Sequence, residues 1–268
     1  MAAQREQAAR PWRDACLKRN DAASSSSRGE RDGQPLTGPV WFQPPLKLIF
    51  DTFKLTLAYR TKFPFVDEEL DKKLKEAGFS SSAPGHTVLR LSSDGQESVA
   101  FRWTGSGSEV YYDPARAFLS AEGNVPESVR EAFGKLIGIA KALLSSGWPT
   151  EIKWSELYSV IRVLGDRQPL ESYSVAYSPK IVERMTKLLG VPVKPFLFAV
   201  FGSSETLVGQ PLDEVPDWTN IILEPFIQNP KYYFMKVVFR RQDISKVVDF
   251  ASKLETTAGS VISEIEGH

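Results

Sequence analysis

Aromatic and basic side chains alternate along residues 231–241, a pattern suited to binding single-stranded nucleic acid. If this segment is a strand, successive side chains point to opposite faces. One face then carries Tyr232, Phe234, Lys236 and Arg240. Rings of this kind stack on bases, and cations pair with phosphates. The pattern therefore predicts a binding surface for single-stranded DNA or RNA on one face of a sheet.

Two other strand-like segments, residues 53–63 and 98–104, add basic and aromatic side chains. The full set predicted to bind nucleic acid is Arg60, Lys62, Arg102, Trp103, Tyr232, Phe234, Lys236 and Arg240. In this set the rings are expected to stack and the cations to pair with phosphates. Ordinary sheet packing explains the same pattern, because aromatic residues favour strands and Lys or Arg often ends them. Both interpretations stay open.

Histidine and cysteine are too scarce for the commonest catalytic and metal-binding arrangements. The two histidines are His86 and His268, and the single cysteine is Cys16. A catalytic triad or a zinc site needs several such residues together. Asp213, Glu214 and Asp217 lie close in sequence among prolines, which favours a solvated turn. We therefore predict a non-catalytic protein without cofactor or metal, and a carboxylate- and metal-dependent hydrolase is the least favoured alternative.

Charge and composition restrict the class of protein. The 268 residues carry 33 basic and 33 acidic side chains, so no bulk positive charge attracts nucleic acid and any contact needs a local patch. One cysteine allows no disulfide framework within the chain, and the apolar runs are too short to span a membrane. These features predict a cytoplasmic protein that is not inserted in a membrane. Only three Asn and five Gln follow residue 45, which favours a thermophilic source.

Three regions follow from the distribution of apolar residues. Residues 1–45 are rich in Ser, Pro and Gly without apolar periodicity, which predicts a disordered arm. Residues 46–150 and 151–268 each show the order β-α-β-β-β-α. The predicted class is α+β, with two tandem halves, a mainly antiparallel sheet and helices packed on one face. The halves are separate domains or share one sheet.

The second half contains elements that are apolar on more than one side. A helix beginning at Ser178 and Pro179 is expected to turn Val182, Met185 and Leu189 inward. Strands at 194–201 and 219–227 carry apolar residues on both faces, which predicts burial on both sides. Packing within the chain, a homodimer or protein-partner interface, and an apolar ligand cavity all explain that pattern. A final helix is predicted to begin after Asp243 as its N-cap.

The order of elements resembles the layout of saddle-shaped tandem repeats such as the TATA-box-binding protein, and of helix-grip ligand-binding folds. The resemblance covers topology, and no sequence motif of either family is present. A helix-grip fold implies an apolar cavity between the last helix and the sheet. The alternative function is therefore a protein-interaction or apolar small-ligand-binding module.

Overall fold

The computed structural model describes residues 47–61, 64–81, 87–91, 97–148, 150–203, 212 and 214–267. All of them belong to a unit that spans Pro45–His268. The predicted arm, residues 1–45, lies outside the described residues, and so do Lys62, His86 and Asp213.

The described residues of the first part form five strands and two helices longer than one turn. In chain order they are β1 (Leu48–Tyr59), α2 (Asp67–Glu76), β2 (Thr87–Leu91), β3 (Glu97–Gly105), β4 (Ser108–Asp113), β5 (Phe118–Gly123) and α3 (Pro126–Leu144), followed by the short 3-10 turn η2 (Ser145–Gly147). The first turn of α2 is acidic and its last turn is basic, which suits the helix dipole. Pro126 occupies the first position of α3, where its missing N–H costs no hydrogen bond.

The second part contains four strands and three helices. In chain order they are β6 (Ile152–Leu164), α4 (Pro169–Ala176), α5 (Pro179–Leu189), β7 (Phe198–Ser203), β8 (Trp218–Pro225), β9 (Tyr232–Arg241) and α6 (Ile244–Glu266). Gly190 ends α5 with a φ of 70°, a left-handed conformation that glycine adopts without strain. The Asp243 carboxylate accepts a hydrogen bond from the Ser245 N–H at 2.9 Å, so the predicted N-cap of α6 is confirmed.

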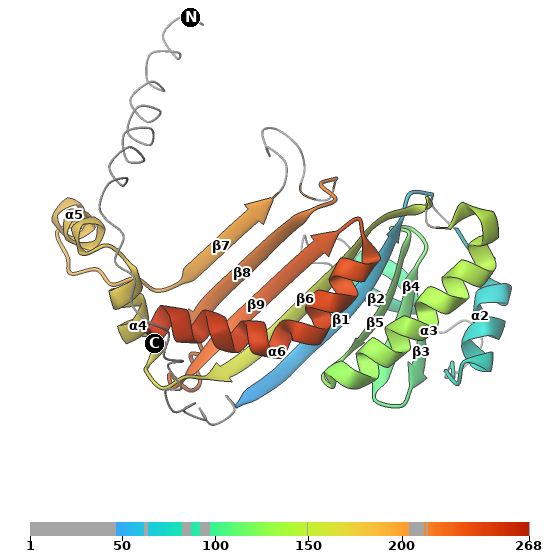
Figure 1. Ribbon diagram of the computed structural model, residues 1–268, viewed down its shortest axis with the longest axis horizontal. Helices are drawn as coiled ribbons and strands as arrows, with labels where there is room; N and C mark the ends of the chain where they lie inside the picture. Colours follow the sequence, from blue (N-terminus) through green and yellow to red (C-terminus); the bar gives the residue numbers. More distant parts are fainter. Residues whose placement is uncertain are drawn as a thin grey trace, which may run out of the picture. The chain divides into compact units, whose positions relative to one another are not determined.

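All nine strands form one antiparallel sheet, shown in Figure 1. The strand order is β2-β3-β4-β5-β1-β6-β9-β8-β7, with the long pair β1 and β6 at the centre. From the central pair to β2 on one side and to β7 on the other, each strand pairs antiparallel with its neighbour. The predicted α+β class with an antiparallel sheet is confirmed.

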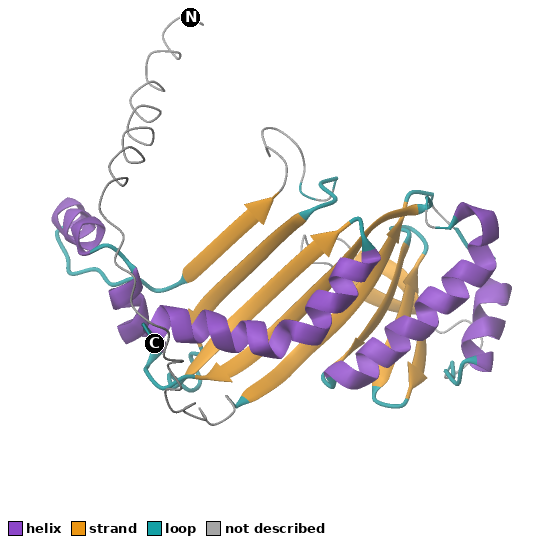
Figure 2. Ribbon diagram, in the orientation of Figure 1, coloured by secondary structure: helices purple, strands orange, loops and turns teal. Residues whose placement is uncertain are grey.

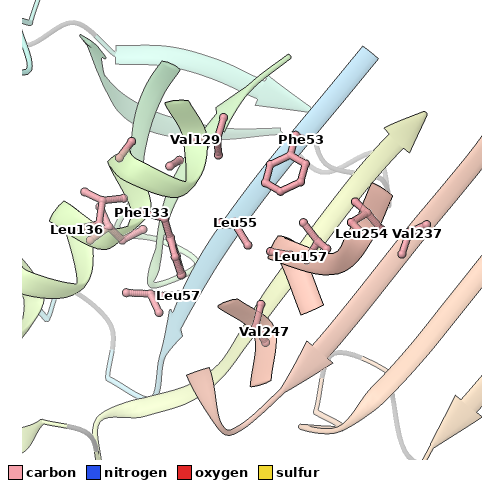
Figure 3. Packing of buried hydrophobic residues seen from close by; sticks show 14 of the residues in the cluster. Phe53, Leu55, Leu57, Val129, Phe133, Leu136, Leu157, Val237, Val247 and Leu254 are labelled. Atoms are coloured by element: carbon pink, nitrogen blue, oxygen red, sulfur yellow. The ribbon is translucent and has the colours of Figure 1, made fainter. Parts of the chain in front are cut away.

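The long helices α3 and α6 lie on the same face of the sheet (Figure 2). α3 covers β1, β4 and β5, whereas α6 covers β6 and β9. Apolar side chains from both helices and the strands below them form one buried core, part of which Figure 3 shows. The labelled side chains there are Phe53, Leu55, Leu57, Val129, Phe133, Leu136, Leu157, Val237, Val247 and Leu254. The opposite face of the sheet is therefore the one on which binding residues have to be sought.

The two parts of the unit are not copies of each other in detail. Between its first strand and its last long helix, the first part has one helix and four strands, whereas the second has two helices and three strands. The strand order nevertheless places β1 and β6 side by side. The last strand of each part, β5 or β9, lies next to this pair, and the earlier strands lie farther out. A tandem relationship between the halves stays a prediction.

At the β7 edge of the sheet, apolar side chains that the sequence predicted to be buried are exposed. The α5 helix has no buried residue, and Met185 and Leu189 are exposed rather than turned inward. Val200 and Phe201 on β7 are also exposed, so this strand is not buried on both sides. The pattern of apolar residues predicted a helix and a strand in this region but not α4 (Pro169–Ala176), and α6 packs mainly on β6 and β9 rather than on β7.

The length and charge of the helices bear on whether any of them could span a membrane. α6 is 23 residues long, yet charged side chains such as Lys246, Asp249 and Lys253 recur along it. Within the described part of the chain, no helix is both long and apolar enough to cross a membrane.

Candidate functional site

The surface of the sheet opposite α3 and α6, which we call the open face, carries one set of β9 side chains. Tyr233, Met235 and Val237 are buried in the core below α6. Side chains alternate along a strand, so Tyr232, Phe234 and Lys236 project to the opposite side. All three are partly exposed.

Two aromatic rings and a guanidinium lie together near the start of β9. The rings of Phe226 and Phe234 are stacked, with centroids 6.2 Å apart and planes 15° from parallel. The Arg162 guanidinium lies 5.3 Å from the centre of the Phe226 ring and is held by Asp51, with Nη2 2.6 Å from Oδ1. We call Tyr232, Phe234, Phe226 and Arg162 the Phe234 cluster.

Lys236 extends the Phe234 cluster along β9. The strand register places Val160 of β6 on one side of it and Ile222 of β8 on the other. These neighbours are apolar, and no ion pair of Lys236 occurs among the described residues. A carboxylate is close to the rings, since the cross-strand partner of Phe234 on β8 is Glu224.

Tyr158 continues the aromatic surface toward the centre of the sheet. It lies opposite Val238 on β9 and opposite Lys54 on β1. Burial raises the pKa of its hydroxyl, and the nearby charges of Glu122 and Glu156 raise it further. The ring therefore stays neutral at physiological pH and offers a flat, uncharged surface.

Arg240 also lies on the open face, but the fold encloses it. Its guanidinium lies 3.8 Å from the Trp154 ring centre and 5.0 Å from that of Trp218. It forms an ion pair of 2.7 Å with Glu156 and donates a hydrogen bond of 2.8 Å to the Leu212 carbonyl. The residue is only 7% exposed. In this position Arg240 stabilises the sheet and does not suit the phosphate contact predicted for it.

Trp103 lies on the helix-covered side of β3, which does not suit the predicted stacking on a base. It is 4% exposed, and its indole N–H donates a hydrogen bond of 2.9 Å to Asp71 of α2. The hydrogen bond from Lys75 is the main cause of a lowered pKa at Asp71, and the indole bond lowers it as well. Trp103 therefore joins α2 to the sheet.

The remaining predicted cations lie far from the Phe234 cluster. Arg102 projects from the open face, but β3 is five strands from β9, which is about 24 Å at ordinary strand spacing. Its guanidinium is 3.7 Å from Glu109. Arg60 follows the opposite end of β1, where it donates to the Thr150 carbonyl at 3.0 Å. Lys62 lies outside the described residues.

The structure thus brings together three of the eight predicted residues, Tyr232, Phe234 and Lys236. It adds Phe226, Arg162 and Tyr158, which sequence reasoning missed. Phe226 could have been found, because a short loop between residues 219–227 and 231–241 predicts a hairpin that puts it near Tyr232. The Phe226 N–H indeed donates to the Tyr232 carbonyl at 2.9 Å. Arg162 could not have been found in this way, because the pairing of β6 with β9 joins distant parts of the chain.

The carboxylates expected in the turn before β8 are not arranged as a metal site. Glu214 is exposed, and Asp217 accepts a hydrogen bond from the Gln242 N–H at 2.8 Å. Among the residues that the structure describes, no group of three potential ligands lies close enough to hold a metal ion.

The space between α6 and the sheet is filled by side chains. Ala251, Leu254, Ala258 and Ile262 face the sheet and are each 1% exposed. A pocket of about 420 Å³ lies elsewhere, between α5 and the chain that follows it, and includes Val182, Glu183 and Lys194 in its lining. The packing below α6 counts against an apolar ligand of the helix-grip type.

Comparison with models of protein families found no match to this sequence, and no curated protein sequence matches it. Function is therefore inferred from the open face alone. Its distinctive feature is a group of partly exposed rings next to a cation without a partner among the described residues.

Proposed function

We propose that this protein binds single-stranded DNA or RNA, without catalysis, through the open face around the Phe234 cluster. One observation carries the proposal: Tyr232, Phe234 and Lys236 share the face that α3 and α6 leave uncovered. A helix over that face would have made these side chains part of a core. The cytoplasm remains the proposed compartment.

The chemistry of the Phe234 cluster suits exposed bases better than a duplex. Flat rings stack on the faces of unpaired bases, each stack contributing about 1–3 kcal/mol. The Arg162 guanidinium is held against Phe226 by Asp51 and offers a second flat surface for stacking. Lys236 lies beside the rings and provides the charge for a phosphate. Duplex DNA hides its base faces, so it would gain little from these groups.

Few free cations on the open face imply a modest affinity with a weak dependence on salt. Arg102, Arg162 and Arg240 each have an acidic partner, so they neutralise few phosphates. For single strands the logarithm of the binding constant falls by about 0.7 per phosphate contact for each tenfold rise in salt. Two or three contacts predict a slope of about −1.4 to −2.1.

Fluorescence anisotropy with labelled oligothymidylate and oligouridylate at about 50 mM salt tests the proposal, because stacking does not depend on base sequence. We expect micromolar binding by the natural sequence. Phe234→Ala should weaken binding by about 5- to 150-fold through loss of one stack. Lys236→Ala should also reduce the salt slope by about 0.7.

Lys253→Ala is the matched control for charge, since Lys253 is an exposed cation on α6, a helix packed on the other face. It should bind like the natural sequence. The absence of binding at tens of micromolar protein would remove the proposal. So would unchanged binding by the double variant Phe234→Ala, Lys236→Ala with an unchanged thermal melting curve.

A further inference from the structure

The α5 helix presents an apolar stripe that packs on nothing in the described part of the chain. Ile181, Met185 and Leu188 follow a helical spacing and are 55%, 42% and 77% exposed. The other side of α5 faces its own chain, because Val182 and Thr186 line the pocket formed with the segment after the helix. The Thr186 hydroxyl accepts a hydrogen bond from the Val193 N–H, which fixes this orientation. The stripe is therefore directed outward.

The edge strand β7 is unusual in lacking protection. Among the described strands it pairs with β8 alone, so no described strand pairs with the backbone groups on its outer side. Its sequence, Phe-Ala-Val-Phe-Gly-Ser, contains no charge and no proline, the usual means of preventing edge pairing. Val200 and Phe201 point to opposite faces, yet they are 49% and 45% exposed. Such an edge accepts a further strand readily.

The α5 stripe and β7 are joined by Phe196 and Leu197, which are also exposed. We call the exposed apolar side chains of residues 181–201 the β7–α5 patch. In Figure 1 α5 lies beside the β7 end of the sheet, apart from α3 and α6. The Tyr177 hydroxyl donates to the Leu197 carbonyl at 2.9 Å and ties the helical part to the strand. This hydrogen bond holds the segment before α5 next to the start of β7.

The area of the β7–α5 patch matches that of an interface between proteins. Summed over α5 and both faces of β7, its apolar residues expose on the order of 800 Å², about the area that each partner buries in a complex of standard size. Patches on monomers are usually smaller, about 300–600 Å². The charges of Glu183 and Lys187 on α5 pair with each other at 2.7 Å, while Lys180, Arg184 and Lys194 add positive charge around the patch.

We infer that a second copy of this chain covers the β7–α5 patch, with the two β7 strands paired antiparallel. A two-fold axis perpendicular to the sheet makes this contact self-complementary and closes it at two copies. Opposed residues in antiparallel strands share a face. With the axis at the middle of β7 (Phe198–Ser203), Val200 lies opposite Val200 or Phe201 opposite Phe201. The α5 stripes of both copies flank the paired strands.

Sedimentation velocity on the full chain tests this inference over about 1–100 µM, a range that spans weak and tight dimers. We expect a species of twice the chain mass of 29.9 kDa. Val200→Lys, on a side chain already half exposed, and Leu188→Glu should each weaken the dimer at least tenfold. Ile227→Lys, at an 86% exposed position outside the patch, is the control and should leave the dimer intact.

A monomer at 100 µM would overturn the inference and would mean that something other than a second copy covers the patch. A dimer that resists both Val200→Lys and Leu188→Glu would overturn it as well. The register is checked by oxidation after Cys16→Ser with Val200→Cys or Phe201→Cys. One of the two should form an intermolecular disulfide, and failure of both would contradict β7 pairing.

Discussion

At the scale of single residues, two buried tyrosines on the helix-covered side have contrasting environments. The Tyr233 hydroxyl is hydrogen-bonded to Glu266 Oε1 at 2.9 Å and to Ser172 Oγ at 2.8 Å. The Glu266 carboxylate is itself 2% exposed and accepts a hydrogen bond of 3.0 Å from the Arg167 N–H. The Tyr59 hydroxyl is equally buried but has no hydrogen-bond partner within the described residues.

This contrast predicts opposite results for the same substitution. Tyr233→Phe should lower the free energy of unfolding by about 1–3 kcal/mol, because it leaves a buried carboxylate without one of its donors. Tyr59→Phe should be neutral or slightly stabilising, because it removes a buried hydroxyl that forms no bond. Urea unfolding of both variants measures the difference. Equal losses in the two variants would show that the Glu266 contacts contribute nothing.

At the scale of elements, Arg240 connects three strands. It lies on β9, its ion-pair partner Glu156 lies on β6, and its guanidinium faces rings on β6 and β8. An enclosed cation with a paired carboxylate is strongly destabilising when one partner is removed.

Arg240→Ala should therefore lower the free energy of unfolding by about 3–5 kcal/mol. Lys236→Ala, on the same face of β9, should change it by less than about 0.5 kcal/mol, since its ammonium group has no ion pair within the described residues. Chemical denaturation compares the two. Similar stability of both variants would contradict the structural role of Arg240. A loss of nucleic-acid binding in Arg240→Ala would not by itself identify a contact.

Local periodicity predicted where helices and strands lie better than it predicted which of their side chains are covered by other elements. The alternation along β9 follows from the strand period, and Asp243 marked the start of α6. The same reasoning should have separated Arg102 from Trp103, because neighbours on a strand face opposite ways. For α5, the helical spacing of apolar residues was correct, but periodicity does not reveal whether a partner covers them. That depends on how far α6 reaches across the sheet.

The location of the candidate site depended on pairings between distant segments. β6 brings Arg162 beside Phe234, although the two are far apart in sequence. Because β1 pairs with β6 at the centre of the sheet, the strands β4, β5, β1 and β6 lie between Arg102 on β3 and β9. No local pattern contains that information, so the sequence predicted a set of residues wider than the Phe234 cluster.

At the scale of the whole described unit, buried tyrosines link stability to alkaline pH. Burial is the main cause of raised pKa values at Tyr59, Tyr112, Tyr173 and Tyr233, and that of Tyr112 rises to about 12. In the unfolded chain a tyrosine titrates near pH 10. A folded-state pKa above the unfolded value leaves stability constant below about pH 10 and lowers it above.

Between about pH 10 and 12 the free energy of unfolding should fall by up to about 1.4 kcal/mol per pH unit for each buried tyrosine. Tyr112→Phe should reduce that slope. Urea titrations at a series of pH values measure it. A free energy of unfolding that is the same at pH 9 and pH 11 would contradict the burial of these hydroxyls.

The two proposed surfaces occupy different parts of the sheet and are compatible. The Phe234 cluster lies on β6, β9 and the end of β8, whereas the β7–α5 patch includes the edge strand. A two-fold axis perpendicular to the sheet would turn both open faces to the same side. A dimer would then present two nucleic-acid surfaces in one direction.

Photo-crosslinking most directly tests the claim that the open face binds single strands. The full chain is irradiated with an oligonucleotide containing 4-thiouridine, and crosslinked peptides are identified by mass spectrometry. We predict crosslinks at Phe226, Tyr232 or Phe234, lost upon Phe234→Ala with Lys236→Ala. Crosslinks confined to α3, α6 or residues 1–45 would contradict the account.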